Sequence, residues 1–241
     1  MTELPQPTAI RLTVSFAEAV YADTHSVEGV RGQLATMETW PAIVDGGNVA
    51  VLVDPPGAVL ARAPAAVIVD AIMAKANTGT ARKSVAVVIA LGPGFTAGTD
   101  VDAVIETMRG HDLGRIIREG RASPDTGTPG DIGGRTSDRV LRAPRDGRVT
   151  HEKQIGEMVS SGEVVMRVEG QPVIAAIGGC LRGCISDKVL ARAGMKIGDV
   201  DPRGDARFIH AVSDKARAVG RAALEAALAI GRERGILRVV R

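Results

Sequence analysis

Three apolar runs of strand length are the feature of this sequence that most constrains its fold. They are Val49–Val53, Ala66–Ala71 and Val85–Leu91. The runs are rich in Val and Ile and do not alternate with polar residues, which is typical of strands buried on both faces in a parallel sheet covered by helices. The first half of the chain is therefore predicted to be α/β, with a short helix over Val59–Arg62 before the second run.

The second half has a different pattern, in which short Val/Ile runs alternate with Gly turns and indicate a small all-β unit. The spacing Ala-x-x-x-Gly-x-Val over Ala143–Val149 recurs over Ala175–Leu181, 32 residues later, with Leu in place of Val. Two copies of a strand–turn–strand element predict a biotinyl/lipoyl-like barrel-sandwich. The turn expected to join the two copies, Glu169–Pro172, contains no Lys, so the sequence argues against a covalently attached swinging-arm cofactor.

Two further segments set the expected domain boundaries. The Gly/Pro-rich stretch Thr126–Gly134 is typical of a structured loop near a boundary. The end of the chain is predicted to be helical, with Ser213 or Asp214 as the N-cap, Gly235 at the stop, and an apolar face of Ala216, Val219, Ala223, Ala227 and Ile230. We therefore predict three domains: an α/β domain (1–136), a barrel-sandwich β domain (137–206) and a C-terminal helical segment (207–241).

Composition excludes several classes of protein. The 241 residues carry a net charge of +2 and only 2% aromatic residues, which argues against a nucleic-acid-binding surface of basic grooves and stacking rings. The two cysteines, Cys180 and Cys184, cannot form a disulfide framework and lack other metal-ligand spacing, so no metal site is expected. No apolar run reaches the ~20 residues that a membrane helix needs. We expect a cytoplasmic protein.

The loop Gly92–Gly98 directly follows the third apolar run. Glycines after a strand let backbone N–H groups converge on an anion. The loop is not a P-loop, because Thr99 stands where Lys would be required, and Pro93 removes one donor. Two readings stay open: Gly92, Gly94, Phe95 and Thr96 contact a phosphate or nucleotide, or the glycines only permit a tight turn.

Two more polar segments are candidates for a site. Lys75 and Asn77 follow the second run, and ligands bind beyond the carboxyl ends of parallel strands, although a solvated loop fits the residues equally well. Glu106 and His111 have the chemistry of an acid and a base, and Arg109 could clamp a carboxylate or phosphate. The alternative for these three is an Arg–Glu ion pair beside a surface His.

Several longer stretches resemble one family, the YqeB proteins. They are Pro7–Arg11, Val14–Tyr21, Val69–Thr80, Leu91–Gly98, Ala103–Arg115, Val140–Pro144, Lys196–Arg203 and Ser213–Ala218. The resemblance covers almost the whole chain. It implies a protein of a selenium-dependent molybdenum hydroxylase system, which accompanies enzymes that use a molybdopterin cofactor.

The resemblance also implies that the α/β domain (1–136) is a truncated Rossmann-like domain, with a Rossmann-like start that this chain does not show in full. Family members are expected to carry a first strand, a glycine-rich phosphate turn and a second strand that ends in Met-Thr-Glu. The chain begins with Met1-Thr2-Glu3, which is similar to the end of that second strand. Glu3 would match the acidic residue that binds ribose, while the glycine turn that anchors the pyrophosphate is missing.

Three functions follow from these observations. The first is an accessory or maturation protein that binds a nucleotide or cofactor precursor and has a molybdenum hydroxylase or its maturation proteins as partner. The second is an NAD(P)-linked oxidoreductase, which requires an upstream segment with the glycine turn. The third is a non-catalytic interaction module. The sequence specifies no cofactor and leaves open whether the chain is an enzyme.

Overall fold

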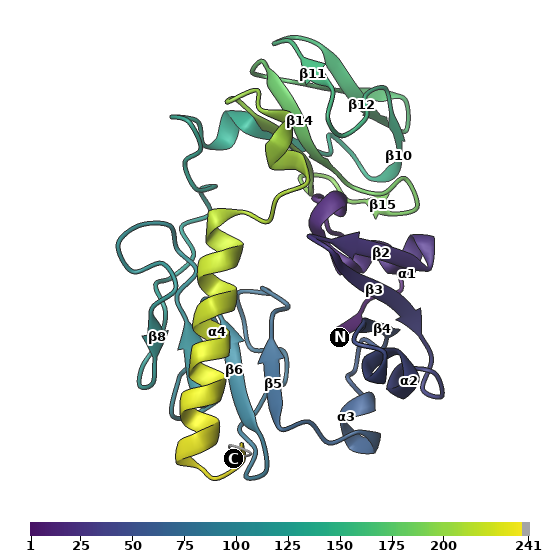
Figure 1. Ribbon diagram of the computed structural model, residues 1–241. Helices are drawn as coiled ribbons and strands as arrows, with labels where there is room; N and C mark the ends of the chain where they lie inside the picture. The colour runs from purple at the N-terminus through teal and green to yellow at the C-terminus, as the bar shows by residue number, and fades with distance from the viewer. Residues whose placement is uncertain (238–241) are drawn as a thin grey trace. The chain divides into compact units, whose positions relative to one another are not determined.

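The computed structural model describes residues 1–237, and the chain divides into two compact units (Figure 1). Unit 1 comprises Met1–Val59 and Asp131–Val212, and unit 2 comprises Leu60–Gly130 and Ser213–Arg241. Both units are discontinuous in sequence, whereas the sequence predicted the consecutive segments 1–136, 137–206 and 207–241. The last four residues of the third segment lie outside the described residues.

The N-terminal part of unit 1 is a four-stranded mixed sheet in the order β1-β4-β3-β2. Its strands are β1 (Thr2–Glu3), β2 (Thr24–Val27), β3 (Val30–Ala35) and β4 (Val49–Val53). Strand β4 is parallel to β1 and β3, and β2 is antiparallel to β3. Around it lie the 3-10 turns η1 (Leu12–Val14) and η2 (Phe16–Glu18) and the helices α1 (Ala19–Ala22) and α2 (Trp40–Asp45). Glu28 and Gly29 both have positive φ, as the tight turn between β2 and β3 requires.

The second part of unit 1 consists of two four-stranded antiparallel sheets, ordered β13-β12-β10-β15 and β11-β14-β16-β9. The elements are η3 (Ser137–Arg139), β9 (Val140–Arg142), β10 (Gly147–His151), β11 (Met158–Val159), β12 (Val164–Val168), β13 (Gln171–Ile174), β14 (Gly179–Cys184), β15 (Leu190–Ala191), β16 (Lys196–Asp201) and η4 (Ala206–Ile209). Both sheets contribute to one apolar core, with Met166, Leu181, Ile185 and Ile197 fully buried.

One arginine joins the two parts of unit 1. The Arg11 guanidinium donates hydrogen bonds to the carbonyls of Phe208 at 2.6 Å, Ile209 at 3.3 Å and Ala211 at 3.0 Å. The Thr13 hydroxyl adds a bond of 2.6 Å to the Ile209 carbonyl. These bonds satisfy the carbonyls at the end of η4, and they tie residues near the N-terminus to a segment almost 200 positions away.

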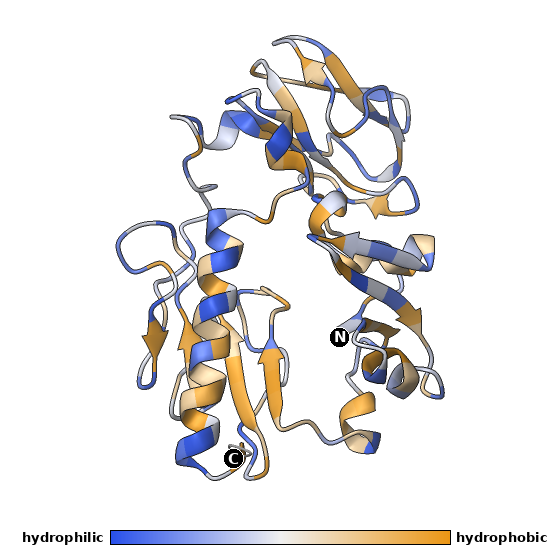
Figure 2. Ribbon diagram, viewed as in Figure 1, coloured by the Kyte–Doolittle hydropathy of each residue, from blue (hydrophilic) through white to orange (hydrophobic). Residues whose placement is uncertain are grey.

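Unit 2 is built on a sheet in the order β5-β6-β7-β8. Strands β5 (Val67–Asp70), β6 (Val87–Leu91) and β7 (Ala103–Ile105) are parallel, and β8 (Ile116–Ile117) is antiparallel to β7. Helix α4 (Asp214–Glu233) covers one face, and a loop that carries Phe95 covers the other. Figure 2 shows β5 and β6 as hydrophobic, whereas α4 alternates between polar and apolar residues.

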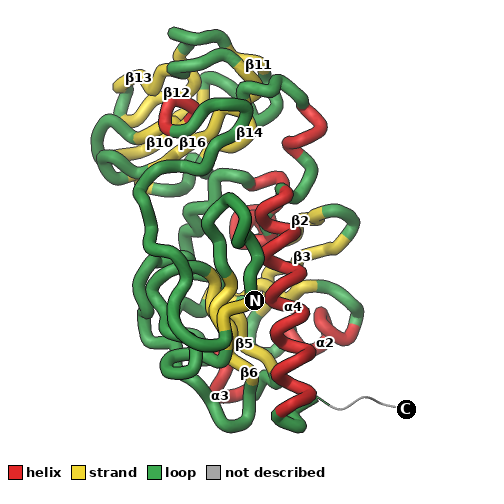
Figure 3. Tube along the Cα trace, turned by 90° about the vertical axis from the view of Figure 1, so that its left-hand side faces the viewer, coloured by secondary structure: helices red, strands yellow, loops and turns green. Residues whose placement is uncertain are grey.

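The two predicted helices are confirmed. Helix α3 spans Val59–Arg62, and α4 begins after Ser213 (Figure 3). The Ser213 hydroxyl accepts a hydrogen bond of 3.2 Å from the Ala216 N–H. Gly235 follows α4 with φ of 66°, the left-handed conformation that commonly ends a helix. Four of the five residues predicted for its apolar face are buried, and Ala216 is exposed.

The predicted fold class was a truncated Rossmann-like parallel α/β domain followed by a biotinyl/lipoyl-like barrel-sandwich domain and a C-terminal helix. It is wrong except for the C-terminal helix, which is α4. The three apolar runs do not share one parallel sheet, because Val49–Val53 lies in unit 1 while β5 and β6 lie in unit 2. Both of these sheets are mixed, and the β-rich segment forms one unit with the N-terminal sheet. Hydrophobic periodicity shows that a strand is buried, but it does not show which strand is its neighbour.

Candidate functional site

Three loops of unit 2 meet at one edge of its sheet, which we call the carboxyl edge. Residues 71–80 follow β5, residues 92–102 follow β6, and residues 106–115 follow β7. Because β5, β6 and β7 are parallel neighbours, their carboxyl ends lie at the same edge, where open α/β sheets bind ligands. The sequence-predicted residues of unit 2 all lie in these loops.

Two glycines bring the loops into direct contact. Gly94 has φ of 109°, and a Cβ atom there would lie 2.6 Å from the backbone nitrogen of Ala76. Gly92 has φ of 77°, and its Cβ would lie 2.6 Å from Oγ1 of Thr107. Each glycine therefore serves both a left-handed turn and a close approach that other residues cannot make.

Most of the backbone N–H groups of the loop Gly92–Gly98 donate hydrogen bonds to acceptors elsewhere in unit 2. The N–H of Thr96 donates to Asp100 at 2.7 Å, and those of Ala97 and Gly98 donate to backbone carbonyls. The Phe95 ring is 3% exposed and belongs to the core, so only the backbone of Phe95 can contact a ligand. Within residues 1–237, the N–H groups of Gly94 and Phe95 have no acceptor, which leaves two adjacent donors for an anion.

The loop after β5 is held by its own polar side chains. Asn77 Oδ1 accepts hydrogen bonds from the N–H groups of Gly79 at 2.9 Å and Thr80 at 2.8 Å. The Thr80 hydroxyl donates to the buried Asp70 carboxylate at 2.5 Å. Lys75 has φ of 62° and pairs with exposed Asp125 at 2.6 Å. Asn77 thus shapes the loop, while the Lys75 ammonium stays at the surface.

Glu106 is a buried carboxylate that connects two loops. Its Oε1 accepts a hydrogen bond from the Met108 N–H and its Oε2 accepts one from the Ser123 N–H, each at 2.8 Å. Burial by itself raises the pKa of Glu106, but these hydrogen bonds outweigh it and hold the pKa below its usual value. Glu106 is therefore ionised at neutral pH, with both oxygens occupied by backbone donors.

Arg109 and His111 have different surroundings from Glu106. The Arg109 guanidinium donates to both carboxylate oxygens of Asp214, at 2.6 and 2.8 Å, and Gly130 packs against its side chain. His111 is exposed in the turn after β7. Glu106 and Arg109 have separate partners although they share one loop with His111, and the catalytic roles of all three stay a prediction.

Lys215 is a site residue that the sequence-based search missed. It lies in the first turn of α4 and is half-buried. Burial lowers its pKa, the neighbouring Arg109 charge lowers it further, and Glu106 acts in the opposite direction. A Lys in the first turn of a helix is placed against the helix dipole, and this was the signal available in the sequence.

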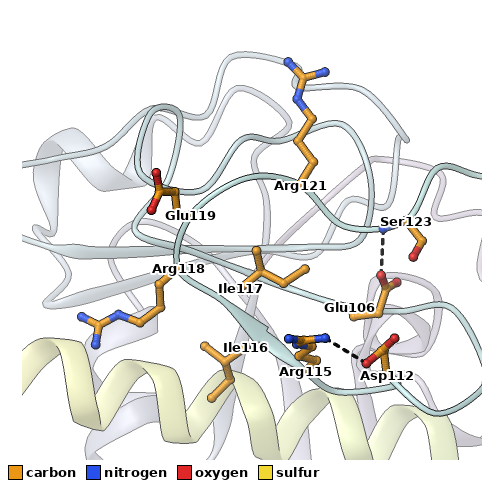
Figure 4. A pocket seen from close by; sticks show the side chains of 9 residues that line it. All are labelled: Glu106, Asp112, Arg115, Ile116, Ile117, Arg118, Glu119, Arg121 and Ser123. Carbon is orange, nitrogen blue, oxygen red and sulfur yellow. Dashed lines mark hydrogen bonds and ion pairs between the residues drawn. The ribbon is translucent and has the colours of Figure 1, made fainter.

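A pocket of about 380 Å³ extends from Glu106 along β8 (Figure 4). Its lining residues are Glu106, Asp112, Arg115, Ile116, Ile117, Arg118, Glu119, Arg121 and Ser123. Arg115 pairs with Asp112 at 3.1 Å, and Arg121 Nε donates to the Thr96 hydroxyl at 2.9 Å. Figure 4 shows the Arg121 guanidinium pointing away from Glu106. Both acidic and basic side chains line the pocket, so its charge is mixed.

The remaining predicted residue, Glu3, belongs to unit 1. It ends β1, pairs with Val53 and accepts a hydrogen bond of 3.1 Å from the Leu4 N–H. Cys180 and Cys184 are both free and buried, and burial raises the pKa of Cys184 to about 12. Across residues 1–237 no three His, Cys, Asp or Glu side chains gather as a metal site would need, and no helix there is long and apolar enough to span a bilayer.

Comparison with known proteins identifies a curated relative. No family model matches the chain. It is 44% identical over 227 residues to the uncharacterized protein YqeB of Escherichia coli (strain K12). This similarity supports the placement of the chain in the YqeB family. The match covers 94% of this chain but 42% of the relative, so the chain spans less than half the length of that protein.

Three solved structures resemble parts of the chain. An aspartoacylase family protein from Mesorhizobium loti has 12% identity and a TM-score of 0.25, over 35% of this chain and 27% of that one. The product-bound ectoine utilization protein EutE (DoeB) from Ruegeria pomeroyi has 21% identity and a TM-score of 0.23, over the same shares. A succinylglutamatedesuccinylase/aspartoacylase from Rhodobacter sphaeroides has 18% identity and a TM-score of 0.26, over 47% and 44%. Scores this low support no conclusion about activity.

Proposed function

We propose that this chain is an accessory protein of a selenium-dependent molybdenum hydroxylase system that binds a small anionic ligand, a nucleotide or a cofactor precursor, at the carboxyl edge of unit 2. The association with a hydroxylase comes from the sequence resemblance. The ligand class comes from the geometry and charge of the three loops.

One observation carries the ligand part of the proposal, namely the contact of Gly94 with the Ala76 backbone. A Cβ at Gly94 would lie 2.6 Å from the Ala76 nitrogen, so two loops from neighbouring parallel strands meet without side chains between them. The adjacent N–H groups of Gly94 and Phe95 are available there. Adjacent backbone donors form concavities that bind phosphate or carboxylate groups.

Cationic side chains at the same edge support an anionic ligand. Lys75 comes from the loop after β5, Arg109 from the loop after β7, and Lys215 from the first turn of α4. Arg109 and Lys75 each hold a carboxylate in this structure. A ligand phosphate or carboxylate would compete with exposed Asp125 and Asp214 for these cations, because exposed ion pairs are weak.

Calorimetry of the full chain with ATP, GMP and a pterin phosphate tests the ligand part. Gly94→Ala places a methyl group against the Ala76 backbone, so we expect the affinity to fall by about ten-fold or more, equivalent to ~1.4 kcal/mol. Gly220→Ala is the matched control, because a Cβ there meets nothing within 4 Å. Since Gly94→Ala also strains the backbone, Lys75→Gln provides a second variant, one that removes a charge without adding main-chain strain.

Three results would contradict or redirect this proposal. Absence of binding to all three ligands would remove the small-ligand part. Unchanged affinity in both Gly94→Ala and Lys75→Gln would move the site away from the carboxyl edge. Co-purification with a hydroxylase subunit without ligand binding would favour a non-catalytic interaction module.

A further inference from the structure

The face of α4 turned away from its sheet carries an exposed apolar row of residues. Side chains four positions apart lie in one row along a helix. One such row, which we call the outer ridge, consists of Ala216, Gly220, Leu224 and Leu228, and all four residues are exposed. Leu224 is 60% exposed and Leu228 is 55% exposed, although the opposite face of the same helix is packed into the core of unit 2.

The outer ridge begins with two small residues and ends with two large ones. A Cβ at Gly220 would meet nothing within 4 Å, so the helix surface is open there. Suppose that two copies of α4 run antiparallel about a two-fold axis midway between Gly220 and Leu224. Leu224 then lies opposite Gly220 of the partner subunit, and Leu228 lies opposite the partner's Ala216. The large side chains fill the space that the small ones leave, so the ridge is complementary in shape to a second copy of itself.

The row of residues beside the outer ridge is complementary in charge under the same symmetry. Arg221 and Glu225 are exposed neighbours on this row. Among the residues that the structure describes, neither side chain holds an ion pair. In an antiparallel helix pair this row faces its own copy, so Arg221 lies near the partner's Glu225 and Glu225 lies near the partner's Arg221. Two identical ion pairs would therefore flank the leucines.

We propose that α4 docks on a second copy of this chain through the outer ridge and forms an antiparallel helix pair with two-fold symmetry. Such a contact needs only one self-complementary surface, and two-fold dimers are the commonest assemblies of soluble proteins. The contact requires no ligand at the carboxyl edge, so it does not rest on the proposed function. Because its apolar part consists of two leucines per copy, the dimer is weak, with a Kd on the order of 10–100 μM.

Sedimentation velocity of the full chain at about 5 to 500 μM, a range that brackets this Kd, tests the proposal. We expect a dimer whose fraction rises with concentration. Leu224→Glu places a charge on the outer ridge and should weaken the dimer about ten-fold or more. Leu190→Glu is the matched control, because Leu190 is 61% exposed and lies in β15 of unit 1. It should leave the dimer unchanged.

Charge reversal distinguishes the two-fold contact from other kinds of self-association. Arg221→Glu and Glu225→Arg each place like charges opposite one another in a dimer of identical chains. Each variant alone should therefore dimerise about ten-fold more weakly or worse. An equimolar mixture of the two variants restores both ion pairs across the axis, so it should form a mixed dimer with the affinity of the unchanged chain.

Three results would overturn the proposal. The first is a chain that stays monomeric at the highest concentration. The second is a dimer that Leu224→Glu leaves unchanged or that Leu190→Glu weakens equally. The third is a mixture of the two charge variants that associates no better than either variant alone. Ligand affinity at the carboxyl edge should be the same in Leu224→Glu as in the unchanged chain, so failure of the dimer and failure of the proposed function are separate outcomes.

Discussion

Arg109 and Asp214 are joined by two parallel hydrogen bonds of 2.6 and 2.8 Å. The pair links the loop after β7 to the first residue of α4, two segments more than 100 residues apart in sequence. It also places the Arg109 charge beside Lys215. The pairing of Arg109 with Asp214 therefore influences the pKa of Lys215 at the carboxyl edge.

We expect the Arg109–Asp214 pair to contribute little to stability. The Asp214 side chain is 71% exposed, and the double-mutant coupling of exposed ion pairs is about 0–1 kcal/mol. Urea unfolding of Arg109→Gln, Asp214→Asn and the double variant measures this coupling. The charge change should matter more for Lys215, whose pKa should rise in Arg109→Gln because a neighbouring cation has been removed. A coupling above ~2 kcal/mol would show that the pair holds the loop on α4.

Glu106→Gln should destabilise the protein by about 1–3 kcal/mol, because the amide NH2 group replaces one of the two oxygens that accept the partly buried N–H groups of Met108 and Ser123. The pKa of Glu106 is lower in the folded protein than in the unfolded chain, so its contribution is complete above the unfolded pKa. It is lost as the pH falls through the folded pKa. Unfolding free energies measured from neutral to acidic pH should fall less steeply for Glu106→Gln than for the unchanged protein. Glu119→Gln, at an exposed position, should change stability by less than ~0.5 kcal/mol.

Asp199 is the buried anion of unit 1 that should be most sensitive to substitution. Its side chain is 1% exposed and pairs with the buried guanidinium groups of Arg139 and Arg182. Asp199→Asn keeps the size but leaves buried positive charge uncompensated, so we expect a loss of about 3–5 kcal/mol. Asp205→Asn is the control, because its partner Arg207 has an 87% exposed side chain. A loss below ~1 kcal/mol for Asp199→Asn would mean that water or neighbouring Asp201 replaces the missing charge.

Two glycines of α4 should respond in opposite directions to the same substitution. Gly220→Ala should stabilise the protein by about 0.5–1 kcal/mol, because Ala is the better helix former and a Cβ meets nothing within 4 Å. Gly231→Ala should destabilise it, since a Cβ there would lie 2.6 Å from Cδ1 of Leu237. Thermal melts of the two variants compare them directly, and a gain in both would show that Leu237 moves aside at no cost.

The two ends of helix α4 were predicted correctly from the sequence. Ser213 and Gly235 mark the two ends of α4 because a hydroxyl acceptor and a residue with positive φ are properties of single positions. The loops after β5, β6 and β7 do meet at one edge, which follows from parallel pairing of neighbouring strands. Lys215 was missed because the Arg109 charge that lowers its pKa lies far away in the sequence.

The sequence by itself determined that the three apolar runs form strands, where the last helix starts and stops, and that glycines follow β6. Only the tertiary structure decided that Val49–Val53 pairs in unit 1 and Val87–Leu91 in unit 2, and that Arg11 joins distant parts of unit 1. The physical reason is that burial depends on a residue's own hydrophobicity and period, whereas strand pairing and ion pairing depend on which distant partner is nearest in space. Hydrophobic patterns do not encode that partner.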